Sequence, residues 1–250
     1  MMIARSTARP LLRPLSRLVA TIAAGLLLSG LPARAATLHV TVDHLHPGGM
    51  IAPHYAFCRA APGNQIAPAD NVNPSVSWSK GPPGTRSYAI ILTDTDSPAA
   101  HRDWMNVPGK MLTAAVKRQS FYHWVLVDIP ASVTRIAAGA VSSARVLHGK
   151  PASASTIGRP GLNTYTVVTA ANPAMKGKYF GYDGPCPPWN DALVHPYHFT
   201  VYALSVAHLA VPAGFDGPQA LAAMQGKILA EGHFLAHYTT NAAKGAVVAK

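Results

Sequence analysis

This sequence is short of acidic side chains and lacks the short motifs of common enzymes. Of its ten acidic residues only Glu231 is a glutamate, so acid–base chemistry would fall to aspartate and histidine. The patterns Cys-x-x-Cys, His-Glu-x-x-His, Gly-x-Ser-x-Gly and the phosphate loop are absent. Blocks of Lys and Arg, and basic residues interleaved with aromatics, are also lacking, which argues against a nucleic-acid partner. We therefore assign no catalytic residue, no metal ligand and no cofactor from motifs.

Stretches of helical periodicity are missing until the C-terminus, which argues against a regular alternation of strands and helices. Two runs, Ile90–Leu92 and Trp124–Val127, are continuously apolar, as expected of strands that are covered on both faces. Pro and Gly separate such runs along the chain. The pattern predicts an antiparallel β-sandwich with strands at Leu38–Val42, Ser75–Trp78, Ser87–Thr93, Tyr122–Ile129 and His198–Val206.

The C-terminal region is the exception to this β pattern. Asp216 is suited to cap a helix that has Pro218 in its first turn. Apolar residues then recur at roughly helical spacing, namely Leu221, Met224, Ile228, Leu235 and Tyr238. Because Gly226 and Gly232 interrupt this pattern, we expect two short helices packed on the sheet. Beyond Thr240 we expect a frayed tail.

Residues 1–35 have the features of a signal peptide. A basic leader precedes the apolar run Leu18–Leu31, and Ala33-Arg34-Ala35 resembles a cleavage site. An uncleaved anchor is the alternative, which the glycines and the shortness of the run disfavour. We expect residues 36–250 to form one periplasmic or secreted domain with peripheral membrane contact at most. Removing the five leader arginines lowers the formal charge from +11 to +6, which suits a small anionic partner.

The chain has two cysteines, Cys58 and Cys186. An exported protein would meet an oxidising compartment, where a disulfide between them is chemically possible. Such a bridge would stabilise the fold by roughly 4–5 kcal/mol in the chain-entropy picture. The sequence does not establish whether the two Cα atoms come close enough to bridge.

Several polar residues stand at the predicted ends of strands. Asp94 and Asp96 follow the strand at 87–93 at a spacing of two, and Pro98 should then turn the chain out of the sheet. His123 opens another predicted strand. Taken singly, the aspartates are explained as turn caps and the histidine as a structural residue. Taken together, they lie where binding residues tend to concentrate.

A proline-rich loop completes this group. Gly181–Pro188 holds three prolines within four residues, which excludes a helix or a central strand and indicates a stiff loop. The chain continues to His195 and Tyr197, which lie on one face of the following strand because strand side chains alternate. We expect these residues to converge with the aspartates and His123 on one small polar pocket.

The ordered set of motifs resembles the phosphatidylethanolamine-binding protein family, in its bacterial Raf-kinase-inhibitor-like branch. The matching segments are 71–78, 93–98, 123–130, 184–188 with His195-x-Tyr197, and 226–231 ending at Tyr238. The resemblance implies a Greek-key β-sandwich with short C-terminal helices and an anion pocket at one end. It suggests as pocket residues Asp94, Asp96, His123, Gly184, Pro185, His195 and Tyr197, with Tyr238 on a helix near the mouth.

Phosphate binding requires several converging donors. We expect ring N–H groups from both histidines, the Tyr197 hydroxyl, and the backbone N–H groups of Gly184 and Cys186. The aspartates would accept from the histidines and favour their charged form. Since no activated nucleophile is evident, we expect binding of phosphate or a phospholipid head group such as phosphoethanolamine, without turnover.

Two other function classes remain open at this point. A metal-dependent hydrolase could use the Asp and His side chains of the pocket, or a second cluster at His39, Asp43, His44 and His46. A protease- or kinase-inhibiting interaction protein is suggested by analogy with family relatives alone. The chain has two long irregular segments, Ala99–Ser120 and Leu147–Lys178. It departs from the family in its Asp-Thr-Asp-Ser-Pro turn, in the length of the first of these segments and in an insertion between Asn163 and Tyr179; the last two concern the rim of the pocket.

Overall fold

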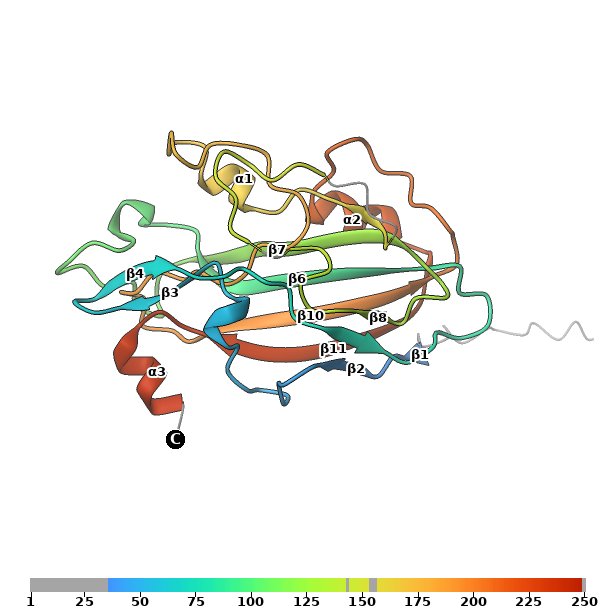
Figure 1. The fold of residues 1–250 in the computed structure, drawn as a ribbon, viewed down its shortest axis with the longest axis horizontal. Helices are drawn as coiled ribbons and strands as arrows, with labels where there is room; N and C mark the ends of the chain where they lie inside the picture. Colours follow the sequence, from blue (N-terminus) through green and yellow to red (C-terminus); the bar gives the residue numbers. More distant parts are fainter. Residues whose placement is uncertain (1–35, 143, 153–156, 249–250) are drawn as a thin grey trace, which may run out of the picture. The chain divides into compact units, whose positions relative to one another are not determined.

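The computed structural model describes residues 36–142, 144–152 and 157–248 (Figure 1). The predicted signal peptide, residues 1–35, lies outside them. The strands are β1 Ala36–Thr37, β2 Val40–Val42, β3 Cys58–Ala61, β4 Gln65–Pro68, β5 Val76–Trp78, β6 Ser87–Pro98, β7 Arg118–Pro130, β8 Arg135–Ile136, β9 Arg159–Pro160, β10 His195–Leu204 and β11 Ile228–Tyr238. The helices are η1 Pro53–Tyr55, η2 Arg102–Trp104, α1 Tyr165–Val168, α2 Gly217–Met224 and α3 Ala242–Val248. None of the described helices is long and apolar enough to cross a bilayer.

Three sheets make up the architecture. The largest has six strands in the order β1-β11-β10-β6-β7-β9, and its four long central strands run side by side in Figure 1. Neighbouring strands in it are antiparallel, apart from the parallel pair β1–β11. A second sheet has the order β2-β5-β8, and β3 and β4 form a hairpin. The predicted mostly β-sheet fold with few short helices is therefore confirmed.

The six-stranded sheet is covered on both faces, as its apolar runs predict. Ile90 and Leu92 pack in the core that the large sheet shares with Val40 and Val76 of the small sheet. Ile91, which lies between them in sequence, packs in a second core with side chains of α2. Successive side chains of a strand point to opposite faces, so each face of the sheet takes half of the run.

The C-terminal prediction is half right. Asp216 caps α2 in a capping box with Gln219, as expected. The expected second helix is wrong, because Ile228–Tyr238 is strand β11, paired with β10 along its length. Gly232 does not break a helix but allows close packing, since a Cβ there would overlap the carbonyl oxygen of Leu38. The expected frayed tail is also wrong, because α3 follows Thr240.

Strand ends differ from the prediction where the polar residues gather. β6 is longer than predicted and runs through Asp94 to Pro98, where it ends as expected, and β10 begins at His195. The long segment 99–120 contains η2 and the first residues of β7, whereas 147–178 contains β9 and α1. The polar strand ends therefore lie next to one another within one sheet.

Candidate functional site

Strands β6, β7 and β10 bring the predicted residues to one small pocket, which we call the strand-end pocket. Tyr197 lies directly opposite Asp94 across the β6–β10 ladder. The pocket has a volume of about 80 Å³. Its walls are formed by Asp94, Ser97, Pro98, Arg102, Met105, Phe121, His123, Tyr165, Val168, Cys186, Pro187, Pro188, His195 and Tyr197. The predicted convergence of Asp94 with both histidines is therefore present in the structure.

A buried chain of alternating charges runs along one side of this pocket. The Nδ1 atom of His195 lies 2.7 Å from Asp94 Oδ2, and its Nε2 atom lies 3.2 Å from Asp191 Oδ2. The first contact is a hydrogen bond, whereas the second lies outside hydrogen-bond geometry. Arg118 then binds both carboxylate oxygens of Asp191, at 2.5 and 3.0 Å. These three side chains hold His195 between two carboxylates.

His195 is protonated in this arrangement. Burial by itself would lower its pKa, but the contacts with Asp191 and Asp94 outweigh burial and raise the pKa to about 9. Burial would likewise raise the pKa of Asp191, but its contacts with the charged side chains of His195 and Arg118 lower it below the usual value. With two carboxylates, one imidazolium and one guanidinium, the chain carries no net charge.

His123 is in the opposite state. Burial lowers its pKa to about 4, so the ring is neutral at physiological pH. Its Nδ1 lies 2.8 Å from the carbonyl oxygen of Asp183, which can only accept, so Nδ1 carries the proton and Nε2 is an acceptor. The expectation that His123 supplies a charged donor is therefore wrong: the ring lies too deep to stay ionised, and its one N–H is already used.

Beneath the pocket, Asp183 anchors a buried polar network. Its carboxylate accepts from the side chains of Asn71 and Asn163, at 2.7 Å each, and lies 3.0 Å from Lys150 Nζ. Burial raises the pKa of Asp183, and Lys150 partly opposes that rise. Since each oxygen of this fully buried carboxylate has a partner, the network fixes the segment that leads into the proline-rich loop.

The proline-rich loop packs behind the pocket wall rather than pointing donors into it. The backbone N–H of Gly184 donates to Asn71 Oδ1 at 2.8 Å, and Pro185 O accepts from the backbone of Phe57. A Cβ at position 184 would overlap the Tyr55 carbonyl oxygen, so only glycine fits there. Gly184 and Pro185 do not line the pocket, which corrects their expected role.

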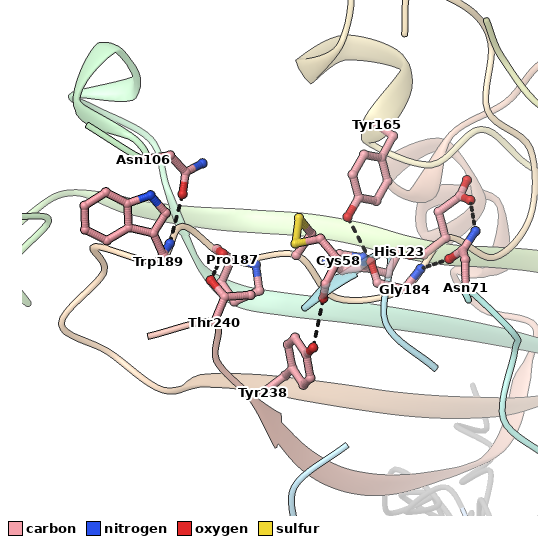
Figure 2. Close-up of a disulfide and its surroundings, with 12 residues drawn as sticks. Cys58, Asn71, Asn106, His123, Tyr165, Gly184, Pro187, Trp189, Tyr238 and Thr240 are labelled. Atoms are coloured by element: carbon pink, nitrogen blue, oxygen red, sulfur yellow. Dashed lines mark hydrogen bonds between the residues drawn. A yellow bond between two sulfur atoms is a disulfide. The ribbon is translucent and has the colours of Figure 1, made fainter. Parts of the chain in front are cut away.

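Cys186 does line the pocket, and it forms a disulfide with Cys58 with the two Cα atoms 5.0 Å apart. Figure 2 shows the bridge with Tyr165 on one side and Tyr238 on the other. The Tyr165 hydroxyl donates to Gly184 O and the Tyr238 hydroxyl to Cys58 O. Tyr238 is therefore a buried support at the end of β11, and its expected place on a helix at the pocket mouth is wrong.

Asp96 is another predicted residue that does not line the pocket. On β6, Asp94 pairs with Phe121 and Ser97 pairs with Gln119, so β6 has one residue more than β7 in this interval. Such a bulge resets the alternation of side chains, and Ser97 instead of Asp96 lines the pocket. The backbone N–H of Asp96 donates to Asp94 Oδ1 at 2.8 Å, so the residue supports the site through its backbone.

Tyr197 presents a polar group that the protein does not use. Its side chain is fully buried. Its hydroxyl makes no hydrogen bond of acceptable geometry among the described residues, although it lies close enough to the Asp94 carboxylate to interact with it. Burial and the neighbouring charge of Asp94 raise its pKa well above the usual value, so the hydroxyl remains protonated. Its ring contacts that of His123, with centroids 5.3 Å apart. The hydroxyl is thus a donor on the wall of the pocket.

Several residues of the site were not predicted from the sequence. Asp191 carries a signal that could have been used, since it is a carboxylate four positions before His195 in a chain with few carboxylates. Its partner Arg118 and the network residue Lys150 carry none, because their roles depend on contacts across 73 and 33 residues of sequence. Arg102 was passed over as part of a long irregular segment.

The described residues contain no group of three or more His, Cys, Asp or Glu side chains placed to share a metal ion. In the second cluster considered above, Asp43 pairs with Arg135 at 2.8 Å instead of gathering its neighbouring histidines.

Comparison with known proteins shows the family of this chain. The sequence model of the phosphatidylethanolamine-binding protein family matches residues 41–239. The chain belongs to that family. Among its relatives, a UPF0098 protein from Aquifex aeolicus is 31% identical over 169 residues, which cover 67% of this chain and 74% of that protein. The UPF0098 protein YbcL from Escherichia coli is 26% identical over 74% of this chain and 78% of YbcL.

Solved structures agree on the fold. The crystal structure of E. coli YbcL, described as a new member of the mammalian PEBP family, has a TM-score of 0.57 and 23% identity. The match covers 82% of this chain and 99% of YbcL. A homologue from Chlamydia trachomatis gives 0.53 and 24%, with 82% and 98% covered. The family resemblance inferred from ordered motifs is therefore confirmed, including its bacterial branch.

Proposed function

We propose that this protein is exported and binds a small anionic ligand in the strand-end pocket, without chemical turnover. The ligand carries a phosphate group, either free or in a phospholipid head group such as phosphoethanolamine. Family membership supports the choice of ligand class. Membrane contact, in this proposal, is peripheral.

The observation that carries the proposal is the Tyr197 hydroxyl. A buried hydroxyl without a partner costs free energy, because it has lost water and gained nothing in return. This cost is recovered when a ligand oxygen accepts from the hydroxyl. Asp94 accepts from His195 Nδ1, and the N–H of His123 donates to a backbone carbonyl, whereas the Tyr197 hydroxyl is a donor that the fold has kept available.

The surroundings of the pocket's serine support the proposal of binding without turnover. Ser97 is the aliphatic hydroxyl on the wall, and it has no hydrogen bond to a histidine or carboxylate in the described part of the chain. A serine without a base is a poor nucleophile.

Tyr197→Phe is the sharpest test, because it removes one oxygen that has no protein partner. Binding of inorganic phosphate, measured by calorimetry, should weaken about ten- to a hundredfold, since a hydrogen bond to a charged group contributes roughly 1.5–3 kcal/mol. The free energy of unfolding should stay the same or rise slightly. Unchanged phosphate affinity would show that the hydroxyl is not part of a binding site.

The matched control is Tyr182→Phe. Tyr182 is also buried, but its hydroxyl donates to Tyr55 O and its ring lies outside the pocket lining. This variant should lose stability and keep its affinity for phosphate, the reverse of Tyr197→Phe. Competition between inorganic phosphate and phosphatidylethanolamine vesicles then separates a free from a lipid-borne ligand. N-terminal sequencing of the natively produced protein, with residue 36 expected first, tests export.

A further inference from the structure

Arg102 is a cationic side chain on the pocket wall that the protein leaves without a partner. It belongs to the single turn η2 and lines the strand-end pocket together with Asp94 and Tyr197. Among the described residues, its guanidinium makes no hydrogen bond and no ion pair. Arg118, another arginine close to the pocket, is committed to both oxygens of Asp191. Arg102 therefore differs from Arg118 in being free to bind a ligand.

The remaining pocket groups do not supply a positive charge. Asp94 and Asp191 cancel His195 and Arg118, and His123 is neutral. The N–H of His195 at Nδ1 is directed to Asp94, and the N–H of His123 at Nδ1 to a backbone carbonyl. Without a further cation, an anion would leave water for a site with no excess of positive charge, which is unfavourable.

We propose that Arg102 is a ligand-binding residue that pairs with two oxygens of a phosphate group, while Tyr197 donates to a third oxygen and His123 Nε2 accepts from a protonated one. This inference rests on the proposed function and makes the ligand class narrower. The unprotonated nitrogen of a neutral imidazole can only accept a hydrogen bond, so its partner on the ligand must be a donor. The site therefore fits a phosphate group that carries a proton. The planar guanidinium fork matches two phosphate oxygens, which a lysine ammonium does not.

Hydrogen bonds with Asn190 hold the segment that carries Arg102 in place. Asn190, which is 4% exposed, donates through Nδ2 to Trp104 O at 2.8 Å and to Lys110 O at 3.1 Å, and its Oδ1 accepts from the Asn106 backbone at 2.9 Å. Asn106 Oδ1 in turn accepts from the Trp189 backbone, as Figure 2 shows. The backbone of the arginine-bearing segment is therefore fixed beside the pocket, and only one side chain has to become ordered on binding.

Calorimetry with inorganic phosphate on the oxidised protein tests the assignment through three variants at constant ionic strength. Arg102→Gln should weaken binding about tenfold or more, and Arg102→Lys should fall between it and the native protein. Lys110→Gln removes the same charge from the same loop, outside the pocket lining, and should change affinity less than about twofold. Because Arg102 is exposed and unpartnered, its variants should unfold at the native urea concentration.

The outcomes separate the two proposals. If the native protein binds phosphate and Arg102→Gln binds equally well, the role of Arg102 is wrong while the anion pocket stands. Equal weakening by Arg102→Gln and Lys110→Gln would mean that phosphate affinity depends only on the net charge of the loop. That result would also contradict the proposed role of Arg102. If the native protein binds neither inorganic phosphate nor phosphoethanolamine, the proposed function fails and this inference fails with it. Similar losses for both probes would identify the phosphate group as the shared feature; a loss for phosphoethanolamine alone would contradict that.

Discussion

The charge on His195 makes a quantitative prediction about pH. Its pKa of about 9 in the folded protein exceeds the ordinary value of 6.5, so the folded state holds this proton more tightly than the unfolded chain does. The resulting stabilisation is fully present below pH 6.5 and is lost as the pH rises through 9. The gap between the two values corresponds to about 3 kcal/mol in total.

The measurable part of this effect lies between pH 6 and pH 8. Over that interval the free energy of unfolding should fall by roughly 2 kcal/mol from His195 alone. His123 contributes with the opposite sign, because its pKa of about 4 lies below the ordinary value of 6.5. Its stabilisation is present above pH 6.5 and is lost as the pH falls towards 4. The two histidines together place their joint optimum near pH 6.5.

Urea unfolding at several pH values, followed by tryptophan fluorescence, measures the free energy. Nitrogen chemical shifts of the imidazole rings, measured by NMR over the same range, report which histidine titrates where. The expected result is one ring that remains doubly protonated at pH 8 and one that remains neutral at pH 5.5. If the His195 ring lost its proton at or below pH 6.5, the view of an imidazolium held between Asp94 and Asp191 would be wrong.

Two further predictions concern the framework. Replacing both cysteines by serine should lower the free energy of unfolding by about 5 kcal/mol, because the Cys58–Cys186 bridge closes a loop with a sequence separation of 128; an equal urea midpoint with and without reductant would contradict this. Gly232→Ala should destabilise the fold by more than about 1 kcal/mol, since the new Cβ would overlap the Leu38 carbonyl. Gly245→Ala is the control, because the nearest atom to its new Cβ lies 3.8 Å away and no loss of stability is expected. Thermal unfolding of both variants measures the difference, and equal stability would show that the Leu38 segment relaxes to admit the methyl group.

The sequence was informative about the site wherever period-two spacing and chain stiffness determine geometry. His195 and Tyr197 lie at the start of one strand, and strand alternation alone predicts that they share a face. The pairing of the two cysteines could not be settled, because it depends on a fold that brings β3 against a loop 128 positions away. Long-range contact, not local pattern, decided that question.

The errors have specific physical causes. Asp96 was misplaced by a bulge, which depends on how β6 and β7 are matched and leaves no local mark. Strand β11 was taken for a helix because its buried face consists largely of small residues, Ala230, Gly232 and Ala236, whose period of two is faint on a hydrophobicity scale. The predicted charge of His123 was wrong because burial of the ring keeps it neutral. The extent of burial depends on how the whole core packs, which local sequence does not show.

One wall of the pocket is made of a covalent cross-link. Cys186 contributes surface to the cavity and at the same time fastens the β3–β4 hairpin beneath it. A sample prepared in a reducing cytosol would therefore differ from the disulfide-bonded molecule in the pocket wall, where affinity is to be measured. The free thiols of the sample should be counted before any binding titration. A mixture of molecules with and without the disulfide would give two classes of site.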